Sequence, residues 1–187
     1  MDAFSYLSVL LSIILGLAIT QILQGLRGLM QARGRLVVYA PAVTWALLLL
    51  VVDVQSWWAT YTLRHVQEWN FAAFGVVVAH SICLYMLAAL ALPDVHGEAP
   101  IDLRAHYWGH YRWFFTFVAL TALLGIAKDP AIHGHWPQTT NLVCQLAFAA
   151  AGGIAASTRS EGYHRLLAPA AVLGFVGYIA LLFAQLA

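Results

Sequence analysis

Two ionisable side chains, Asp53 and His80, stand within long apolar runs of the sequence. Counted along a helix from Pro41, Asp53 lies roughly 18 Å deep, and His80, counted from Phe71, lies roughly 14 Å from the opposite edge of a membrane core about 30 Å thick. The two residues therefore share a depth near the midplane, where an ionisable group is costly and is a functional candidate. They could form a structural pair between two helices, or a site that binds protons or a cation on a permeation path.

Tyr178 lies at a similar depth in the last apolar run, and it could complete a polar layer with Asp53 and His80. Further polar residues that could join this layer are Gln55, Ser56, Ser81 and Thr121. Each of these four is, taken alone, more typical of a hydrogen bond between helices.

A second candidate site is the segment PDVHGEAPIDLRAHYWGHYRW, in which Asp102, His106 and His110 are spaced four residues apart. On a helix these three side chains share one face, and such a set can chelate zinc or iron. The segment therefore predicts a possible divalent metal site, to which Asp94, His96 and Glu98 could add ligands. The alternative is an interfacial helix start, with Asp102 capping the helix N-terminus.

The composition sets the class of protein that must position these residues. Of the 187 residues, 62% are hydrophobic and 9% are charged, too few charges to cover the surface of a soluble globule of this size. This excludes a soluble enzyme, a nucleic-acid-binding protein and a disordered chain. The sequence instead predicts an all-α, polytopic membrane helix bundle, a single integral domain over residues 1–187 that has the lipid bilayer as its partner.

Six spans account for the apolar runs, each close to the roughly 20 residues that cross a bilayer. The fourth span can extend backwards to a helix start at residue 102. The predicted spans are 4–26, 41–63, 71–92, 112–127, 139–157 and 166–187.

The basic residues predict the orientation of the bundle. The first, third and fifth loops hold seven arginines, whereas the second and fourth hold only Arg64 and Lys128. Because basic loops stay in the cytoplasm, both termini are expected on the outer side, which is the periplasm in a bacterium. Cys83 and Cys144 both fall in predicted spans, so we expect no disulfide framework.

A run of small residues in the fifth span, Ala149, Gly153 and Ser157, predicts a smooth face for close helix packing. That face could pack within the bundle or between protomers, so a homo-oligomer or a partner membrane protein is expected.

Three segments of the chain resemble a group of small bacterial inner-membrane proteins that have no assigned activity. These segments are YLSVLLSIILGLAITQILQGL, QSWWA and DLRAHYWGHYRWFF, and the similarity runs over most of the chain. The resemblance implies a bacterial inner membrane and carries no chemistry.

Three functions fit these observations. The first is a small transporter or channel with a protonatable midplane site at Asp53, His80 and Tyr178. The second is a metal-dependent membrane enzyme that acts on a lipid or apolar substrate through Asp102, His106 and His110. The third is a non-catalytic membrane subunit of a larger assembly. The three functions are ranked in this order, and the enzyme comes after the transporter because the chain shows no full ligand set and no nucleophile signature.

Overall fold

The computed structural model describes residues 3–66, 69–95, 97 and 99–184. Within these ranges the chain forms six α-helices, all long and apolar enough to cross a membrane, and two very short strands. The helices are α1 (Ala3–Gln31), α2 (Ala40–Thr60), α3 (Phe71–Ala91), α4 (Leu103–His133), α5 (Thr139–Ser157) and α6 (Glu161–Ala184). The all-α membrane bundle predicted from the composition is therefore confirmed.

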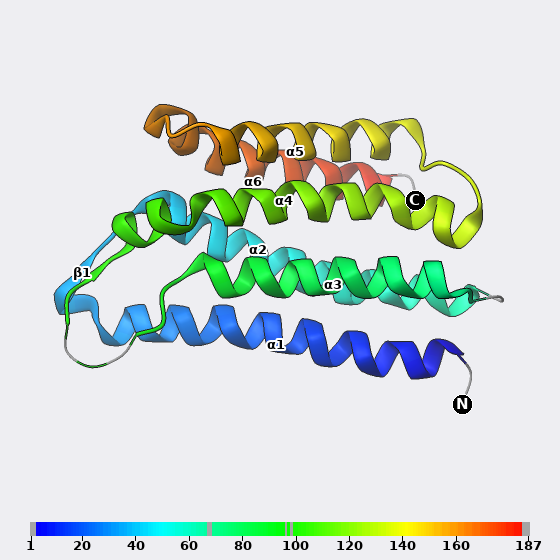
Figure 1. Ribbon diagram of the computed structural model, residues 1–187, viewed down its shortest axis with the longest axis horizontal. Coiled ribbons are helices and arrows are strands. Elements are labelled where there is room, and N and C mark those ends of the chain that lie inside the picture. Colours follow the sequence, from blue (N-terminus) through cyan, green and yellow to red (C-terminus); the bar gives the residue numbers. More distant parts are fainter. Residues whose placement is uncertain (1–2, 67–68, 96, 98, 185–187) are drawn as a thin grey trace.

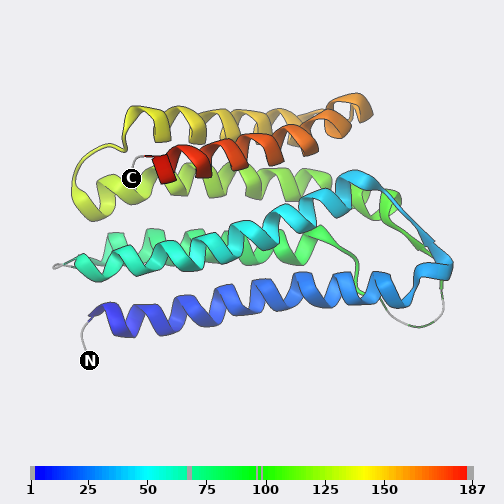
Figure 2. The ribbon, with the colours of Figure 1, turned by 180° about the vertical axis from the view of Figure 1, so that it is seen from behind.

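The helices run up and down in two layers. In Figures 1 and 2, α1, α3, α4 and α5 lie side by side in one layer, and α2 and α6 lie behind it. Both chain termini and the α2–α3 and α4–α5 connections lie at one end of the bundle, here called the termini end. The other end carries the α1–α2, α3–α4 and α5–α6 connections with most of the arginines, and it is called the arginine end.

Local sequence signals fix several helix ends. The Asn70 side chain accepts a hydrogen bond of 2.7 Å from the Ala73 amide at the start of α3. Pro41 lies in the first turn of α2, where the missing N–H has no helical partner to lose. Gly134 ends α4 in the left-handed conformation, with φ of 72°, and its amide donates to the Pro130 carbonyl.

The arginine end is tied together by the connections themselves. Strand β1 (Leu36–Val37) pairs in parallel with β2 (Ile101–Asp102), which joins the α1–α2 connection to the segment before α4. The Arg35 guanidinium donates to the carbonyl oxygens of Gly97 and Ala99. A 3₁₀ turn at Arg33–Arg35 precedes β1, and a second, at Tyr61–His65, follows α2 at the opposite end.

An apolar core extends through the arginine half of the bundle. The Trp45 ring lies edge-on to Phe114 and Phe115, with ring centroids 5.6 and 5.4 Å away. Outward faces are also apolar: Leu173 is 74% exposed and Val176 is 58% exposed. Apolar side chains on both the inside and the outside of a bundle are typical of helices surrounded by lipid.

Two boundary predictions were wrong in ways that affect function. Helix α4 starts at Leu103, as the backward extension predicted, but it runs on to His133 and so takes in Lys128, which the sequence had placed in a loop. Helix α6 starts at Glu161 rather than near Leu166. Tyr178 lies in the last third of α6, where its hydroxyl donates to Asn141 near the start of α5.

Within the described bundle, α5 packs against α4 through Gly152, so the predicted face with Gly153 and Ser157 is left for the other alternative, packing between protomers, which stays a prediction. A Cβ on Gly152 would lie 3.0 Å from the Ala119 nitrogen and 3.2 Å from the Phe115 oxygen of α4, whereas a Cβ on Gly153 would have no such neighbour within 4 Å. The face that carries Gly153 and Ser157 is exposed in the described bundle. The face of α5 that contacts α4 is the neighbouring one, which carries Gly152.

Candidate functional site

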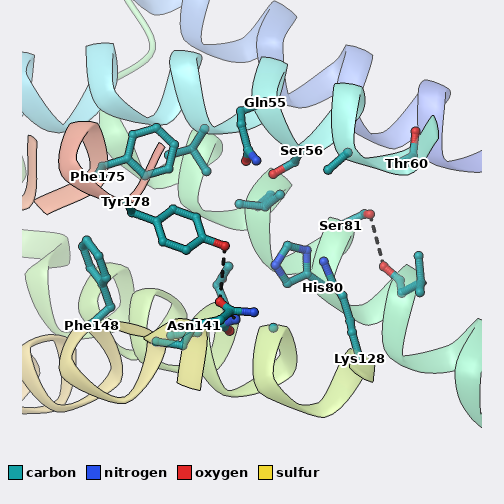
Figure 3. Close-up of a pocket in the computed structure, with 18 of the residues that line it drawn as sticks. Gln55, Ser56, Thr60, His80, Ser81, Lys128, Asn141, Phe148, Phe175 and Tyr178 are labelled. Carbon is teal, nitrogen blue, oxygen red and sulfur yellow. Dashed lines mark hydrogen bonds between the residues drawn. The ribbon is translucent and has the colours of Figure 1, made fainter. Parts of the chain in front are cut away.

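A cavity of about 490 Å³ lies between the two helix layers and extends from Trp45, in the arginine half of the bundle, to the termini end. All six helices contribute side chains to its wall. Leu63, Ile132 and His133, from the connections and helix ends at the termini end, mark where the cavity reaches that end. A volume of this size is typical of sites for small molecules, which are usually between about 300 and 1,000 Å³. The polar residues labelled along its wall in Figure 3 are Gln55, Ser56, Thr60, His80, Ser81, Lys128, Asn141 and Tyr178.

His80 on α3 and Lys128 on α4 reach the cavity from adjacent helices. Figure 3 shows the Lys128 side chain extending toward the His80 imidazole, and the two are electrostatic neighbours. In the described part of the chain neither side chain has a hydrogen bond or an ion pair with another residue. Nitrogen donors that lack a protein partner inside a bundle are available to a ligand or to water.

Asn141, Gln145 and Tyr178 form a hydrogen-bonded group on the opposite wall. The Asn141 Oδ1 atom accepts from the Gln145 amide at 2.7 Å and from the Tyr178 hydroxyl at 3.2 Å. Because both bonds use the oxygen, the Asn141 amide N–H groups remain free to donate. Asp129 also lines the cavity and is an electrostatic neighbour of Tyr178.

The cavity is closed toward the arginine end. Its floor includes Trp45, and the aromatic rings of Phe114 and Phe115 pack edge-on against that indole. Tyr107 continues this aromatic packing, with its ring centroid 6.2 Å from that of Phe115. The cavity therefore extends from side chains at the termini end to a floor of packed rings.

Asp53 does not lie in this cavity. It is fully buried on α2, and neither carboxyl oxygen has a hydrogen-bond partner among the described residues. Its neighbours Val52 and Ser56 line the cavity, whereas Asp53 projects from an adjacent face of the helix. The predicted contact between Asp53 and His80 is absent from the part of the chain that the structure describes, because equal depth in a membrane does not fix the direction in which a side chain points.

The predicted metal ligands have other partners. Asp102 caps α4 by accepting hydrogen bonds from the amides of Arg104 at 2.8 Å and Ala105 at 3.0 Å. The His106 Nε2 atom lies 3.1 Å from the Leu90 carbonyl, and the His110 Nδ1 atom lies 3.0 Å from the His106 carbonyl. Among the described residues no three His, Cys, Asp or Glu side chains gather as a metal site would require. His96 and Glu98, named above as further ligands, lie outside the described residues.

A buried polar contact at the arginine end was not anticipated from the sequence. His164 is fully buried; its Nδ1 atom lies 2.8 Å from the Tyr107 hydroxyl and its Nε2 atom lies 3.0 Å from the Thr158 carbonyl. A carbonyl can only accept, so Nε2 carries the hydrogen and the tyrosine hydroxyl donates to Nδ1. Every ring atom that can form a hydrogen bond is satisfied, so this contact ties α4 to α6 and is structural.

The structure thus brings His80, Tyr178 and the four accessory polar residues to one cavity. Sequence reasoning missed Lys128, Asn141 and Gln145. The spacing of Asn141 and Gln145 by one helical turn was an available signal, and so was Lys128 as the only lysine of the chain. Both cysteines are free, as expected, and Cys144 lies in the cavity wall.

Comparison with known proteins adds no further constraint on the site, since no protein-family model, no curated protein and no solved structure matches the chain.

Proposed function

We propose that the protein is a small transporter whose solute binds in the cavity between the two helix layers. The observation that supports this most directly is a cavity inside the spans that carries polar side chains, reaches one end of the bundle and is bounded by packed rings at the other. A continuous pore is the signature of a channel, whereas a pocket with one closed end is what alternating access requires of a carrier.

The unpaired donors in the wall support a binding role over a purely structural one. A lysine within a membrane span is costly unless it pairs or faces water, and Lys128 has no ion pair in the described residues. His80 beside it is a second nitrogen group in the wall that has no hydrogen bond or ion pair with another described residue. Together they offer the protonatable site expected of the transporter, with Tyr178 on the other wall and without the direct participation of Asp53.

The distribution of arginines supports an orientation for this transporter. With the arginine end in the cytoplasm, the termini end of the cavity faces the outer side of the membrane. The bacterial inner membrane as the location rests on the sequence resemblance alone.

Uptake into liposomes tests the proposal. The purified protein is reconstituted, and uptake of radiolabelled monocarboxylates, amino acids, sugars and inorganic ions is compared with protein-free liposomes. We expect one of these classes to enter faster with protein, and Lys128→Met to reduce that rate at least tenfold. Arg64→Gln is the matched control, because it removes a positive charge at the same end of the bundle but outside the cavity wall. Uptake of every class at the protein-free rate would contradict the proposal.

A further inference from the structure

The lining of the cavity changes character along its length. On α2, the lining residues Leu48 and Val52 are apolar, and Gln55 and Ser56, closer to the termini end, are polar. The same change occurs on α5, which runs the other way: Asn141 and Gln145 precede Phe148.

The remaining walls repeat this order. On α3, His80 and Ser81 are followed by Leu84 and Leu87 toward the floor. On α4, Val118 lies about 15 Å along the helix from Lys128 and closer to the floor. On α6, Phe175 is closer to the floor than Tyr178. Toward the floor, five helices therefore change from polar to apolar lining, so the cavity has an apolar lower part. The upper part holds the polar side chains, together with the apolar Val77, Ile132 and Leu63 at the termini end.

Only some of the polar side chains in the upper part have hydrogen-bond donors that are free for a ligand. The hydroxyl groups of Thr60 and Ser81 already donate to carbonyls of their own helices, at 2.6 and 3.2 Å. The donors without a protein acceptor in the described chain are instead Lys128, His80, the Gln55 and Asn141 amides, and the hydroxyls of Ser56 and Thr121. Several free donors around one lysine favour a compact anion that accepts hydrogen bonds.

We infer that the cavity binds a single-chain amphiphile with a compact anionic head, such as a medium-chain fatty acid. The carboxylate lies between Lys128 and His80, and the alkyl tail extends toward Trp45 along the apolar lower wall. This inference rests on the proposed function, since it names the chemical class of the solute. Asp129 is the one acidic residue in the described wall, and it is an electrostatic neighbour of both Lys128 and Tyr178, so it opposes the anion and limits its affinity.

Binding to the full chain in lipid nanodiscs tests the head and the tail separately. Laurate carries both, dodecanol has the tail without the charge, and butyrate has the charge with a short tail. We expect saturable binding of laurate, at least tenfold weaker binding of dodecanol, and weaker binding still of butyrate. Laurate binding no stronger than to empty nanodiscs, or butyrate binding as tight as laurate, would overturn the inference.

Variants locate the head group. Lys128→Met is expected to weaken laurate at least tenfold and to leave dodecanol unchanged, so retained dodecanol binding shows that the variant is folded. Asp129→Asn is expected to tighten laurate binding, and Arg64→Gln is expected to leave it unchanged. If dodecyltrimethylammonium binds more tightly than laurate, the ligand has a cationic head group bound by Asp129, and the inference of an anionic head group is refuted.

A signal from the wild-type sequence avoids dependence on variants. Lys128 is the only lysine, so reductive methylation with ¹³C gives one side-chain resonance besides the chain terminus. Laurate is expected to shift that resonance and dodecanol is expected not to; an unmoved signal at saturating laurate would contradict the placement of the head. If laurate binds but does not enter liposomes, the transport proposal is refuted and the amphiphile site stands. If another class of solute is taken up and laurate does not bind, the amphiphile site is refuted and the transport proposal stands.

Discussion

Substitution of two adjacent glycines tests the contact between α4 and α5, which carries Lys128, Asn141 and Gln145 into the same cavity. In Gly152→Ala, the new methyl group would lie 3.0 Å from the Ala119 nitrogen and 3.2 Å from the Phe115 oxygen. These are backbone atoms of α4 that cannot turn aside, so the helices must separate. Overpacking of this kind typically costs about 1–3 kcal/mol. Gly153→Ala is the matched control, since its methyl group would meet nothing within 4 Å.

The difference between the two variants isolates the packing cost. Each replaces a helical glycine with alanine, so the propensity gain of up to about 1 kcal/mol is common to both and cancels. We expect Gly152→Ala to be less stable than Gly153→Ala by about 1–3 kcal/mol in the free energy of unfolding. Titration with sodium dodecyl sulfate in mixed micelles, followed by tryptophan fluorescence and circular dichroism, measures it. Equal stability of the two variants, or a larger loss for Gly153→Ala, would refute the assigned α5 face.

The same titration checks three further side chains. Tyr107→Phe leaves the buried His164 Nδ1 atom without a donor, and we expect a loss of about 1–3 kcal/mol; a loss below 0.5 kcal/mol, on the order of experimental error, would show that the contact is not formed. Asp102→Ala removes the cap of α4 and should lower the free energy of unfolding by about 1 kcal/mol, whereas Asp102→Asn should lower it less. A loss of stability in Asp102→Ala that appears only with Zn²⁺ present would instead support the metal site predicted from the sequence. Asp53→Asn should change stability by less than about 1 kcal/mol, because no partner is lost; a loss of about 3–5 kcal/mol would mean that Asp53 has a charged partner.

Composition and apolar run length were enough to predict the helical bundle and the number of spans, because the bilayer imposes both. Helix ends were predicted less well. The sequence ended the fourth span at Ala127 because Lys128 is charged, yet α4 continues because the lysine faces a cavity instead of lipid.

The cavity itself could be predicted only in part. The depth of a residue along its helix follows from its number, and on this basis the sequence grouped His80 with the accessory polar residues that line the same cavity. The direction of a side chain around its helix depends on which neighbours pack where, and no periodic pattern shows this when a helix is apolar on every face. For that reason the sequence paired Asp53 with His80, missed Lys128 and did not identify Gly152 as the contact with α4.

Thiol labelling tests the central claim that the cavity is open to water at the termini end alone. Cys144 lines the cavity, and Cys83, which is buried outside it, serves as the internal control. A membrane-impermeant maleimide is added to either side of proteoliposomes whose orientation is established by proteolysis of an N-terminal tag, with Cys83→Ala and Cys144→Ala to assign the label. The expected result is rapid labelling of Cys144 from the termini side only, with Cys83 unlabelled until the protein is denatured. Labelling of Cys144 from the arginine side alone, or from neither side, would contradict the one-ended cavity and the transporter proposed from it.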